Sequence, residues 1–249
     1  MMGFAMNVYP DPVLKKYICR IGLLMCTVSC SFAQTKSTQL WTDFTVNKLL
    51  QKGYSFDCEF SYRTILGSSE KWHSLNIIPK IEKALDKHWD LMFYMGSINT
   101  LQQAGDNTWE LRPSLGVRYH FMLFNKLMLR LLARFELRNQ YNIDSTTWTH
   151  DFRSRFRLEE IYFINGQSYA DNHLWYILSD LEVFTTVDKE LQERFSNRAL
   201  LRLGLGYKLS DSWRFETIYT YQFSKNTIDG EFGKEQEGVL RLRFRYTIN

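Results

Sequence analysis

The stretch "GVLRLRFRYTI", from Gly238 to Ile248, carries arginine at every second position. Arg241, Arg243 and Arg245 alternate with leucine, phenylalanine and tyrosine. Successive side chains of a strand point to opposite faces, so this segment as a strand has one basic face and one apolar face. A helix would spread the same arginines around its circumference. The period of two therefore predicts a strand that lies between two very different environments.

The same alternation recurs along most of the chain. After a first candidate strand at 39–47, it is found in "YSFDCEFSYR", "WELRPSLGVRYHF", "KLMLRLLARFELR", "FRSRFRLE", "NRALLRLGLGYKL" and "WRFETIYTYQF". Segments near 73–83, 88–98 and 174–185 fit it less cleanly. "KLMLRLLARF" and "DKELQERFSNRALL" also fit a helical period, and their context favours strands. We count about eleven strands, and because bacterial single-chain barrels usually have an even number, we expect ten or twelve.

The cost of placing arginine in lipid decides which face points outward. One arginine at the bilayer midplane of a barrel's outer face costs roughly 2 to 4 kcal/mol, so three would cost on the order of 6 to 12 kcal/mol. The arginines are therefore expected to face inward. Closure of the sheet pairs every strand edge, as lipid requires. The sequence predicts an all-β fold, an antiparallel transmembrane β-barrel of about 10–12 strands.

The alternative fold is a secreted β-sandwich, in which one face of each strand meets a core and the other meets water. So many apolar faces would need a very large core. Short turns such as "LSDS", "LDKH" and "LFNK" alternate with longer connections, as in outer-membrane barrels, although "NGQSYADNH" is long where a short turn is expected. Seven tryptophans stand near expected strand ends, where an interfacial girdle would place them: Trp41, Trp72, Trp89, Trp109, Trp148, Trp175 and Trp213.

The N-terminal stretch has the layout of a secretory signal peptide. Basic residues at 15, 16 and 20 precede an apolar run at 21–28 and the small-x-small pattern that ends at Ala33. We expect residues 1–33 to comprise an upstream extension plus a cleavable signal peptide, and residues 34–249 to form a single barrel domain. Val13 or Leu14 is a candidate alternative start. The predicted location is therefore the outer membrane of a Gram-negative bacterium.

Two other interpretations of this stretch are weaker. A lipoprotein signal would lipidate Cys30, but Thr27 is a poor match three positions before it. A retained membrane helix would need roughly 20 apolar residues, and the run is far shorter. Cleavage after Ala33 leaves Cys58 as the single cysteine, which excludes an intramolecular disulfide.

The longest alternating runs also resemble a known family. "NHLWYILSDLEVF", "ERFSNRALLRLGLGYKLSDSWRFETIYTYQF" and "GVLRLRFRYTI", together with "ELRPSLGVRYHF" and "DFRSRFRLE", resemble domain of unknown function 2490, a family of bacterial outer-membrane β-barrels without assigned activity. The elements Glu182-Val183-Phe184 and Asn197-Arg198 contribute to the resemblance. It implies insertion by the barrel assembly machinery, although such proteins commonly finish on an aromatic residue and this chain finishes on Ile248-Asn249.

Charged residues on the inward face are the candidate functional residues. One interpretation is a polar lumen whose arginines favour anions, which would make the protein a narrow channel for small polar or anionic solutes. The other is a closed structural or ligand-binding surface barrel, in which Arg112, Arg134, Arg155, Arg202 and Arg243 pair with Glu110, Glu136, Glu159, Glu182 and Glu216 across a narrow interior. The full candidate set is Glu110, Arg112, Arg130, Arg134, Glu136, Arg153, Arg155, Arg157, Glu159, Glu182, Arg198, Arg202, Glu216, Arg241, Arg243 and Arg245.

The sequence carries no pattern typical of an enzyme, so we expect the protein to have no enzymatic activity. The five histidines have no serine two positions on, as a nucleophile pair on one strand face would require, and they lack metal-ligand spacing. The "GLG" of "RLGLGYKL" lies within a strand and is not a phosphate-binding loop. No cofactor or metal is predicted.

Removal of residues 1–33 takes the formal charge from +4 to about +2, which gives no nucleic-acid footprint. The expected partners are outer-membrane lipid and the assembly machinery, with any solute or protein ligand unspecified.

Overall fold

The computed structural model describes residues 38–66, 71–102, 106–186, 191, 196–225 and 234–248. The chain divides into two units, Met1–Thr35 and Lys36–Asn249, and the described residues belong to the second. The predicted extension and signal peptide, residues 1–33, lie outside the described residues, as does most of "DKELQERF". No helix among the described residues is both long and apolar enough to cross a membrane.

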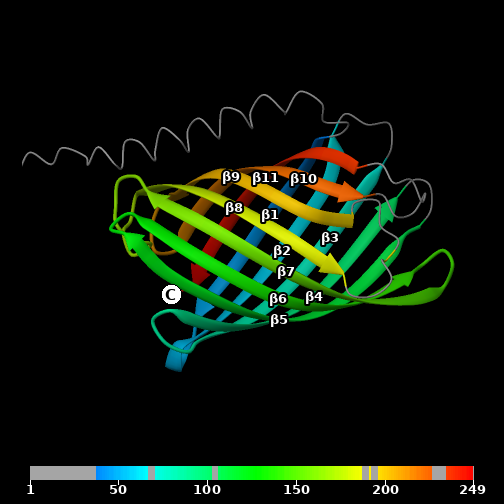
Figure 1. Ribbon diagram of the computed structural model, residues 1–249, viewed down its shortest axis with the longest axis horizontal. Helices are drawn as coiled ribbons and strands as arrows, with labels where there is room; N and C mark the ends of the chain where they lie inside the picture. The colour runs from blue at the N-terminus through cyan, green and yellow to red at the C-terminus, as the bar shows by residue number, and fades with distance from the viewer. Residues whose placement is uncertain are drawn as a thin grey trace, which may run out of the picture. The chain divides into compact units, whose positions relative to one another are not determined.

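The described part of the second unit is an all-β barrel (Figure 1). Each strand pairs antiparallel with the next along the chain, and one short 3-10 turn, η2 (Gln51–Gly53), joins the first two strands. The predicted antiparallel barrel is confirmed, and the ambiguous "KLMLRLLARF" forms a strand. The strands are β1 (Thr38–Leu49), β2 (Tyr54–Leu66), β3 (Trp72–Ala84), β4 (Trp89–Gln102), β5 (Thr108–Phe124), β6 (Leu127–Asn142), β7 (Thr147–Phe163), β8 (Leu174–Thr186), β9 (Ser196–Lys208), β10 (Trp213–Lys225) and β11 (Lys234–Ile248).

The barrel closes through a parallel pair. β1 and β11 run side by side in the same direction, from Thr38 opposite Gly238 to Lys48 opposite Ile248. Eleven strands of alternating direction leave the first and the last pointing the same way, so their closing ladder must be parallel. A parallel ladder pairs the backbone N–H and C=O groups of the two edge strands, as an antiparallel ladder does. The described residues form eleven strands, which confirms the count of about eleven and the predicted range of about 10–12. The expectation of an even number, ten or twelve, is wrong for them.

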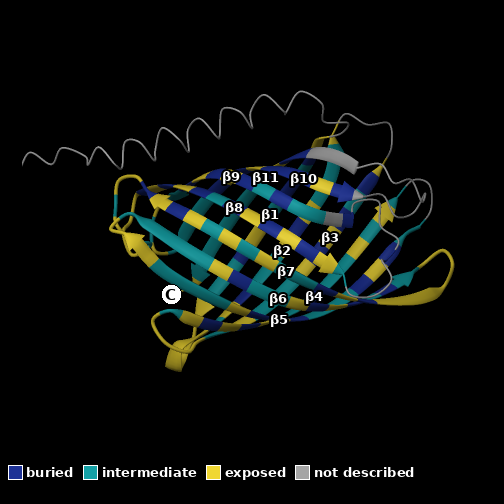
Figure 2. Ribbon diagram, in the orientation of Figure 1, coloured by how far each residue is buried: buried dark blue, intermediate teal, exposed yellow. Residues whose placement is uncertain are grey.

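The two faces of the sheet differ as the alternation predicts. On β6 the outward Leu131 and Phe135 are 47% and 45% exposed, whereas the inward Glu136, which follows Phe135 directly, is 1% exposed. Figure 2 shows this banding of exposed and buried positions along the strands. The outer face therefore presents apolar side chains, and the inner face holds most of the charges.

Aromatic side chains gather at the two rims. The end of the barrel that carries the connections 50–53, 85–88, 125–126, 164–173 and 209–212 is called the turn end here, and the opposite end the loop end. Ring pairs at the turn end include Trp89 with Tyr119 and Trp175 with Tyr207, with centroids 4.8 and 4.5 Å apart. Trp109 packs on Trp148 at the loop end.

Two of the seven tryptophans do not belong to a girdle. Trp41 and Trp72 are 4% and 8% exposed and line the interior of the barrel. Both fall on the inward parity of their strands, and the Arg63 guanidinium lies 4.1 Å from the centroid of the Trp41 ring. The prediction that they sit at the interface is wrong, because strand parity rather than nearness to a strand end decides which side a residue faces.

Candidate functional site

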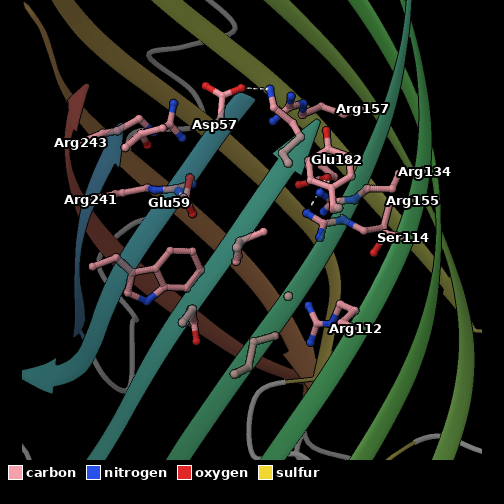
Figure 3. Close-up of a pocket in the computed structure, with 18 of the residues that line it drawn as sticks. Asp57, Glu59, Arg112, Ser114, Arg134, Arg155, Arg157, Glu182, Arg241 and Arg243 are labelled. Carbon is pink, nitrogen blue, oxygen red and sulfur yellow. Dashed lines mark hydrogen bonds and ion pairs between the residues drawn. The ribbon is translucent and has the colours of Figure 1, made fainter. Parts of the chain in front are cut away.

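The interior of the barrel encloses a cavity of about 540 Å³ that is lined by residues from every strand. Its lining extends from Gln39 and Thr108 near the loop end to Leu49 and Ser55 near the turn end. Figure 3 shows charged side chains reaching into it from several strands. Among the described residues, fourteen arginine and lysine side chains and eight carboxylates line it, an excess of six positive charges.

Of the sixteen charged residues predicted from the sequence to face inward, fifteen line this cavity. Arg198 is the exception. It lies at a register shift between β9 and β10, where Ala199 opposes Phe223 and Asn197 opposes Ser224, so that no residue is directly opposite Arg198. A bulge of this kind turns a side chain away from the face that simple alternation assigns to it. The sequence alone does not reveal such a shift.

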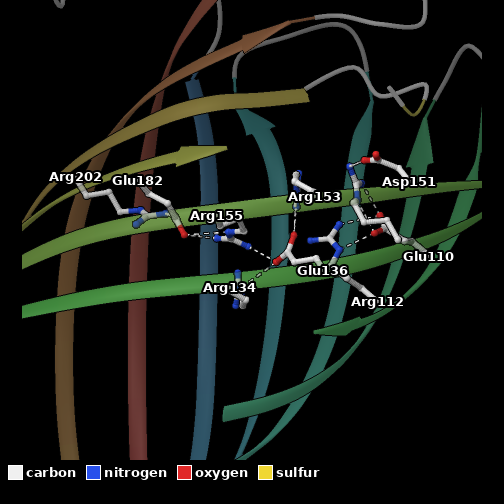
Figure 4. Close-up of polar contacts among 10 residues, drawn as sticks. Glu110, Arg112, Arg134, Glu136, Asp151, Arg153, Arg155, Glu182 and Arg202 are labelled. Carbon is white, nitrogen blue, oxygen red and sulfur yellow. Dashed lines mark hydrogen bonds and ion pairs between the residues drawn. The ribbon is translucent and has the colours of Figure 1, made fainter. Parts of the chain in front are cut away.

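The densest group of charges surrounds Glu136 on β6 (Figure 4). Its carboxylate pairs with Arg134 at 3.0 Å, Arg153 at 2.6 Å and Arg155 at 2.9 Å. Arg155 also donates to Glu182 at 2.8 Å, and so it links carboxylates on the two strands that flank its own. Three cations around a carboxylate that is 1% exposed offset its loss of hydration.

A second group surrounds Glu110 on β5. Arg112 and Arg138 both donate two hydrogen bonds to its carboxylate, at 2.6 to 2.8 Å. This forked geometry is the strongest form of an arginine–carboxylate pair. At the closure of the barrel, Arg241 pairs with Asp43 and Arg243 donates to Glu216 at 2.6 Å.

These ion pairs run around the wall of the barrel and not across it. Within the described residues, each joins side chains of one strand, of adjacent strands or of strands one apart. Arg202 reaches Glu182 on the neighbouring strand, and Arg112 reaches Glu110 on its own. The expectation that these pairs cross the interior is wrong. They brace neighbouring strands and leave the cavity between opposite walls.

The sequence prediction missed the charges on the wall formed by β3 and β4. Lys80 pairs with Asp57 at 2.7 Å, and Arg118 pairs with Glu82 at 2.5 Å and Asp90 at 2.7 Å. In the stretch "IIPKIEK", Lys80 and Glu82 stand on either side of Ile81, and this alternation could have placed both in the interior. Inward apolar residues such as Met92 obscure the pattern of β4.

The long connection between β7 and β8, residues 164–173, covers part of the interior at the turn end. The guanidiniums of Arg130 and Arg214 lie 5.2 and 4.7 Å from the centroid of the Tyr169 ring. Lys208 donates to the Tyr169 carbonyl oxygen at 2.8 Å. The ring also packs edge-on against Tyr176. The sequence signal for this contact is a single tyrosine in a polar connection that is longer than a short turn.

Beneath Tyr169 the interior at this end is filled by apolar side chains. Ile161, Phe163, Leu174, Tyr176, Leu178 and Ile218 form a buried cluster, each at most 3% exposed. Asp171 holds the turn above it by accepting the backbone N–H groups of Gln167 and Ser168 at 2.8 and 3.2 Å. These two hydrogen bonds to its charged form lower the pKa of Asp171 from its ordinary value. Tyr169 and this cluster therefore occupy part of the interior at the turn end.

Comparison with known proteins gives one family match. The family model described as "Protein of unknown function (DUF2490)" matches residues 38–232. No curated protein matches the sequence. A solved structure of the NanC porin in a rhombohedral crystal form is similar to this chain, with 11% sequence identity and a TM-score of 0.47. The similarity covers 78% of this chain and 86% of that one.

Proposed function

Starting from the fact that this chain belongs to the DUF2490 family of proteins of unknown function, we propose that it is a narrow passage for small anionic solutes across the outer membrane of a Gram-negative bacterium. The observation that carries this proposal is the orientation of the ion pairs. They brace the wall and leave a polar cavity whose lining has six more positive than negative charges. Three of these charges are offset by Asp43, Asp90 and Asp180, which lie outside that lining and pair with Arg241, Arg118 and Arg202, so a positive excess remains. Rings of basic side chains favour anions in pores.

The proposed location rests on the outer face and on the N-terminal sequence. An apolar surface rimmed by aromatic pairs fits a bilayer, and a signal peptide ending at Ala33 would deliver the chain to the periplasm. Outer-membrane lipid and the barrel assembly machinery are the partners proposed on this basis.

We also propose that the protein is not an enzyme. Outward-facing histidines are the residues that an interfacial hydrolase on this scaffold would use to activate a nucleophile. His73 bonds to the Tyr62 hydroxyl at 2.7 Å and His150 to the Asn139 side chain at 2.8 Å. His73 faces outward, whereas the adjacent Ser74 is buried on the inward face.

A second candidate function, a non-conducting surface barrel, is favoured by one observation. Tyr169 and the apolar cluster beneath it occupy the turn end of the interior. If that end stays closed, the loops at the other end would be the working part of the molecule.

Planar-bilayer recording of the purified barrel separates the two functions. A passage of this kind should give stable conductance steps and, in a salt gradient, a reversal potential on the side expected for anion selectivity. Arg243→Gln should shift that potential toward zero, while Glu160→Gln, an exposed outward residue of β7, should leave it unchanged. A bilayer that stays silent despite correctly folded protein, or a cation-selective conductance, would refute the proposal.

A further inference from the structure

Three polar side chains are register neighbours near the turn end, on strands that are adjacent in the barrel, and none of the three is a carboxylate. Arg214 on β10 lies directly opposite Arg245 on β11, and Arg245 lies directly opposite Thr45 on β1, across the closure of the barrel. All three line the internal cavity. We call them the Arg214–Arg245–Thr45 row.

The row has unused hydrogen-bonding groups. The Arg245 Nε and Thr45 Oγ1 atoms are buried without a hydrogen-bond partner, and Thr45 is 3% exposed. Within the described residues, neither arginine forms an ion pair, and Arg214 instead lies over the Tyr169 ring. Buried polar atoms in native proteins are nearly always bonded, so such a group calls for a partner.

The carboxylates around the row are bonded to other groups. Glu59, which lies directly opposite Thr45, pairs with Arg241 at 3.5 Å. Glu216 accepts from Arg243 at 2.6 Å and from the Tyr176 hydroxyl at 2.7 Å. Asp57 pairs with Lys80 at 2.7 Å and accepts from Asn47 at 2.9 Å. Like charges directly opposite each other on neighbouring strands are destabilising. An anion between Arg214 and Arg245 would remove that repulsion and satisfy the free donors.

We propose that the Arg214–Arg245–Thr45 row binds a small tetrahedral oxyanion of the phosphate class. Two guanidinium forks and one hydroxyl supply more donors than the two oxygens of a carboxylate can accept, and arginine binds phosphate through paired hydrogen bonds. The row lies inside the barrel wall, so the ligand is a free solute or its phosphoryl group and not a lipid headgroup. This site deepens the proposed function by naming its solute class, and it does not require conduction.

Isothermal titration of the purified barrel with inorganic phosphate, at constant ionic strength, tests the site. We expect saturable binding of one phosphate per barrel, with sulfate competing and acetate binding much more weakly. Arg245→Gln and Arg214→Gln should each weaken phosphate binding about tenfold or more, since each removes hydrogen bonds between a charged donor and the anion. Thr45→Val should weaken it less, because it removes a single neutral donor.

The matched control is Arg63→Gln, which removes a cavity arginine near the loop end and should leave the affinity unchanged. Heat-dependent gel mobility verifies that each variant still forms a barrel. Absence of phosphate binding to the native protein overturns the proposal, as does an equal loss in Arg63→Gln, which would mean that net charge alone attracts the anion. Equal affinity for acetate overturns the tetrahedral class. Phosphate binding without conductance would refute the proposed passage and support the proposed binding site. Conductance without phosphate binding would support the passage and refute the binding site.

Discussion

Gly206 of β9 lies directly opposite Tyr176 of β8, and the tyrosine ring occupies the space that a side chain at Gly206 would fill. Tyr176 is fully buried and its hydroxyl donates to Glu216 at 2.7 Å, so the ring cannot swing away without breaking that bond. The glycine is therefore required by packing inside the barrel. This accounts for the "GLG" stretch, which lies within a strand as the sequence predicts.

We expect Gly206→Ala to destabilise the barrel by about 1 to 3 kcal/mol, the usual cost of overpacking a filled interior. The midpoint of urea unfolding in lipid vesicles measures this. Gly96→Ala is the control, because a methyl group at that inward glycine meets its neighbours at 3.5 Å or more. Equal stability of the two variants would contradict the packing explanation.

The parallel closure predicts a specific disulfide. Phe44 and Phe244 are register partners on the outward faces of β1 and β11, where neighbouring strands lie roughly 4.8 Å apart. In a Cys58→Ala background, Phe44→Cys with Phe244→Cys should cross-link under mild oxidation, which is detected by the altered mobility of the denatured chain. Phe44→Cys with Leu240→Cys, four residues out of register, should not. Cross-linking of the second pair alone would exclude the observed closure.

Tyr169 should restrict flow through the turn end. Tyr169→Ala removes the ring that lies between Arg130 and Arg214, so we expect larger conductance steps than in the native barrel. Gln167→Ala, an exposed position of the same connection, serves as the control and should not alter them. Unchanged steps in Tyr169→Ala would show that the constriction lies elsewhere.

The connection that carries Tyr169 should loosen in acid. Since the folded pKa of Asp171 lies below the ordinary value of about 3.9, its contribution is complete above that pH and is lost as the pH falls through the folded pKa. Amide hydrogen exchange at 167–170, corrected for the intrinsic rate, should therefore be slow at neutral pH and faster below about pH 4. Asp171→Ala should exchange fast at both pH values.

Asp86 provides the matched control for this experiment. It accepts the backbone N–H groups of His88 and Trp89 in the β3–β4 turn, in the same manner and with the same lowering of its pKa. Asp86→Ala should leave exchange at 167–170 unaffected. Protection of that connection that persists at low pH would argue that packing of Tyr169 alone holds it.

Replacement of Glu136 should change both the stability of the barrel and its ion selectivity. Glu136→Gln leaves Arg134, Arg153 and Arg155 without their shared carboxylate, and breaking a buried pair from one side costs about 3 to 5 kcal/mol. We expect a lower urea midpoint together with stronger anion selectivity in the salt-gradient recording. A variant as stable as the native barrel would show that water already solvates these arginines.

Much of the fold follows from the alternation alone, because a period of two together with clustered arginines admits few structures. The inward side of "GVLRLRFRYTI" is an example: Arg241, Arg243 and Arg245 all line the cavity. The strands that fit the pattern least well are those whose inward residues are apolar. Met92 and Tyr176 fill the interior of a narrow barrel, and from sequence they cannot be told apart from lipid-facing residues.

The site was less predictable, since its pairing depends on register. Arg155 could be assigned to the inward face, but the fact that it links Glu136 and Glu182 depends on which residues of β6 and β8 lie beside it. The Arg198 bulge likewise depends on the alignment of β9 with β10. The row at Thr45 depends on the alignment of β1 with β11, which are distant in sequence. Alternation assigns a face to each residue and says nothing of its neighbours on other strands.

Because β1 and β11 are parallel, Thr38 and Ile248 lie at opposite ends of the barrel. The polypeptide thus enters the wall at the loop end and leaves it at the turn end. In the outer-membrane location that we propose, peptide tags placed beside these two residues would report on opposite sides of the bilayer.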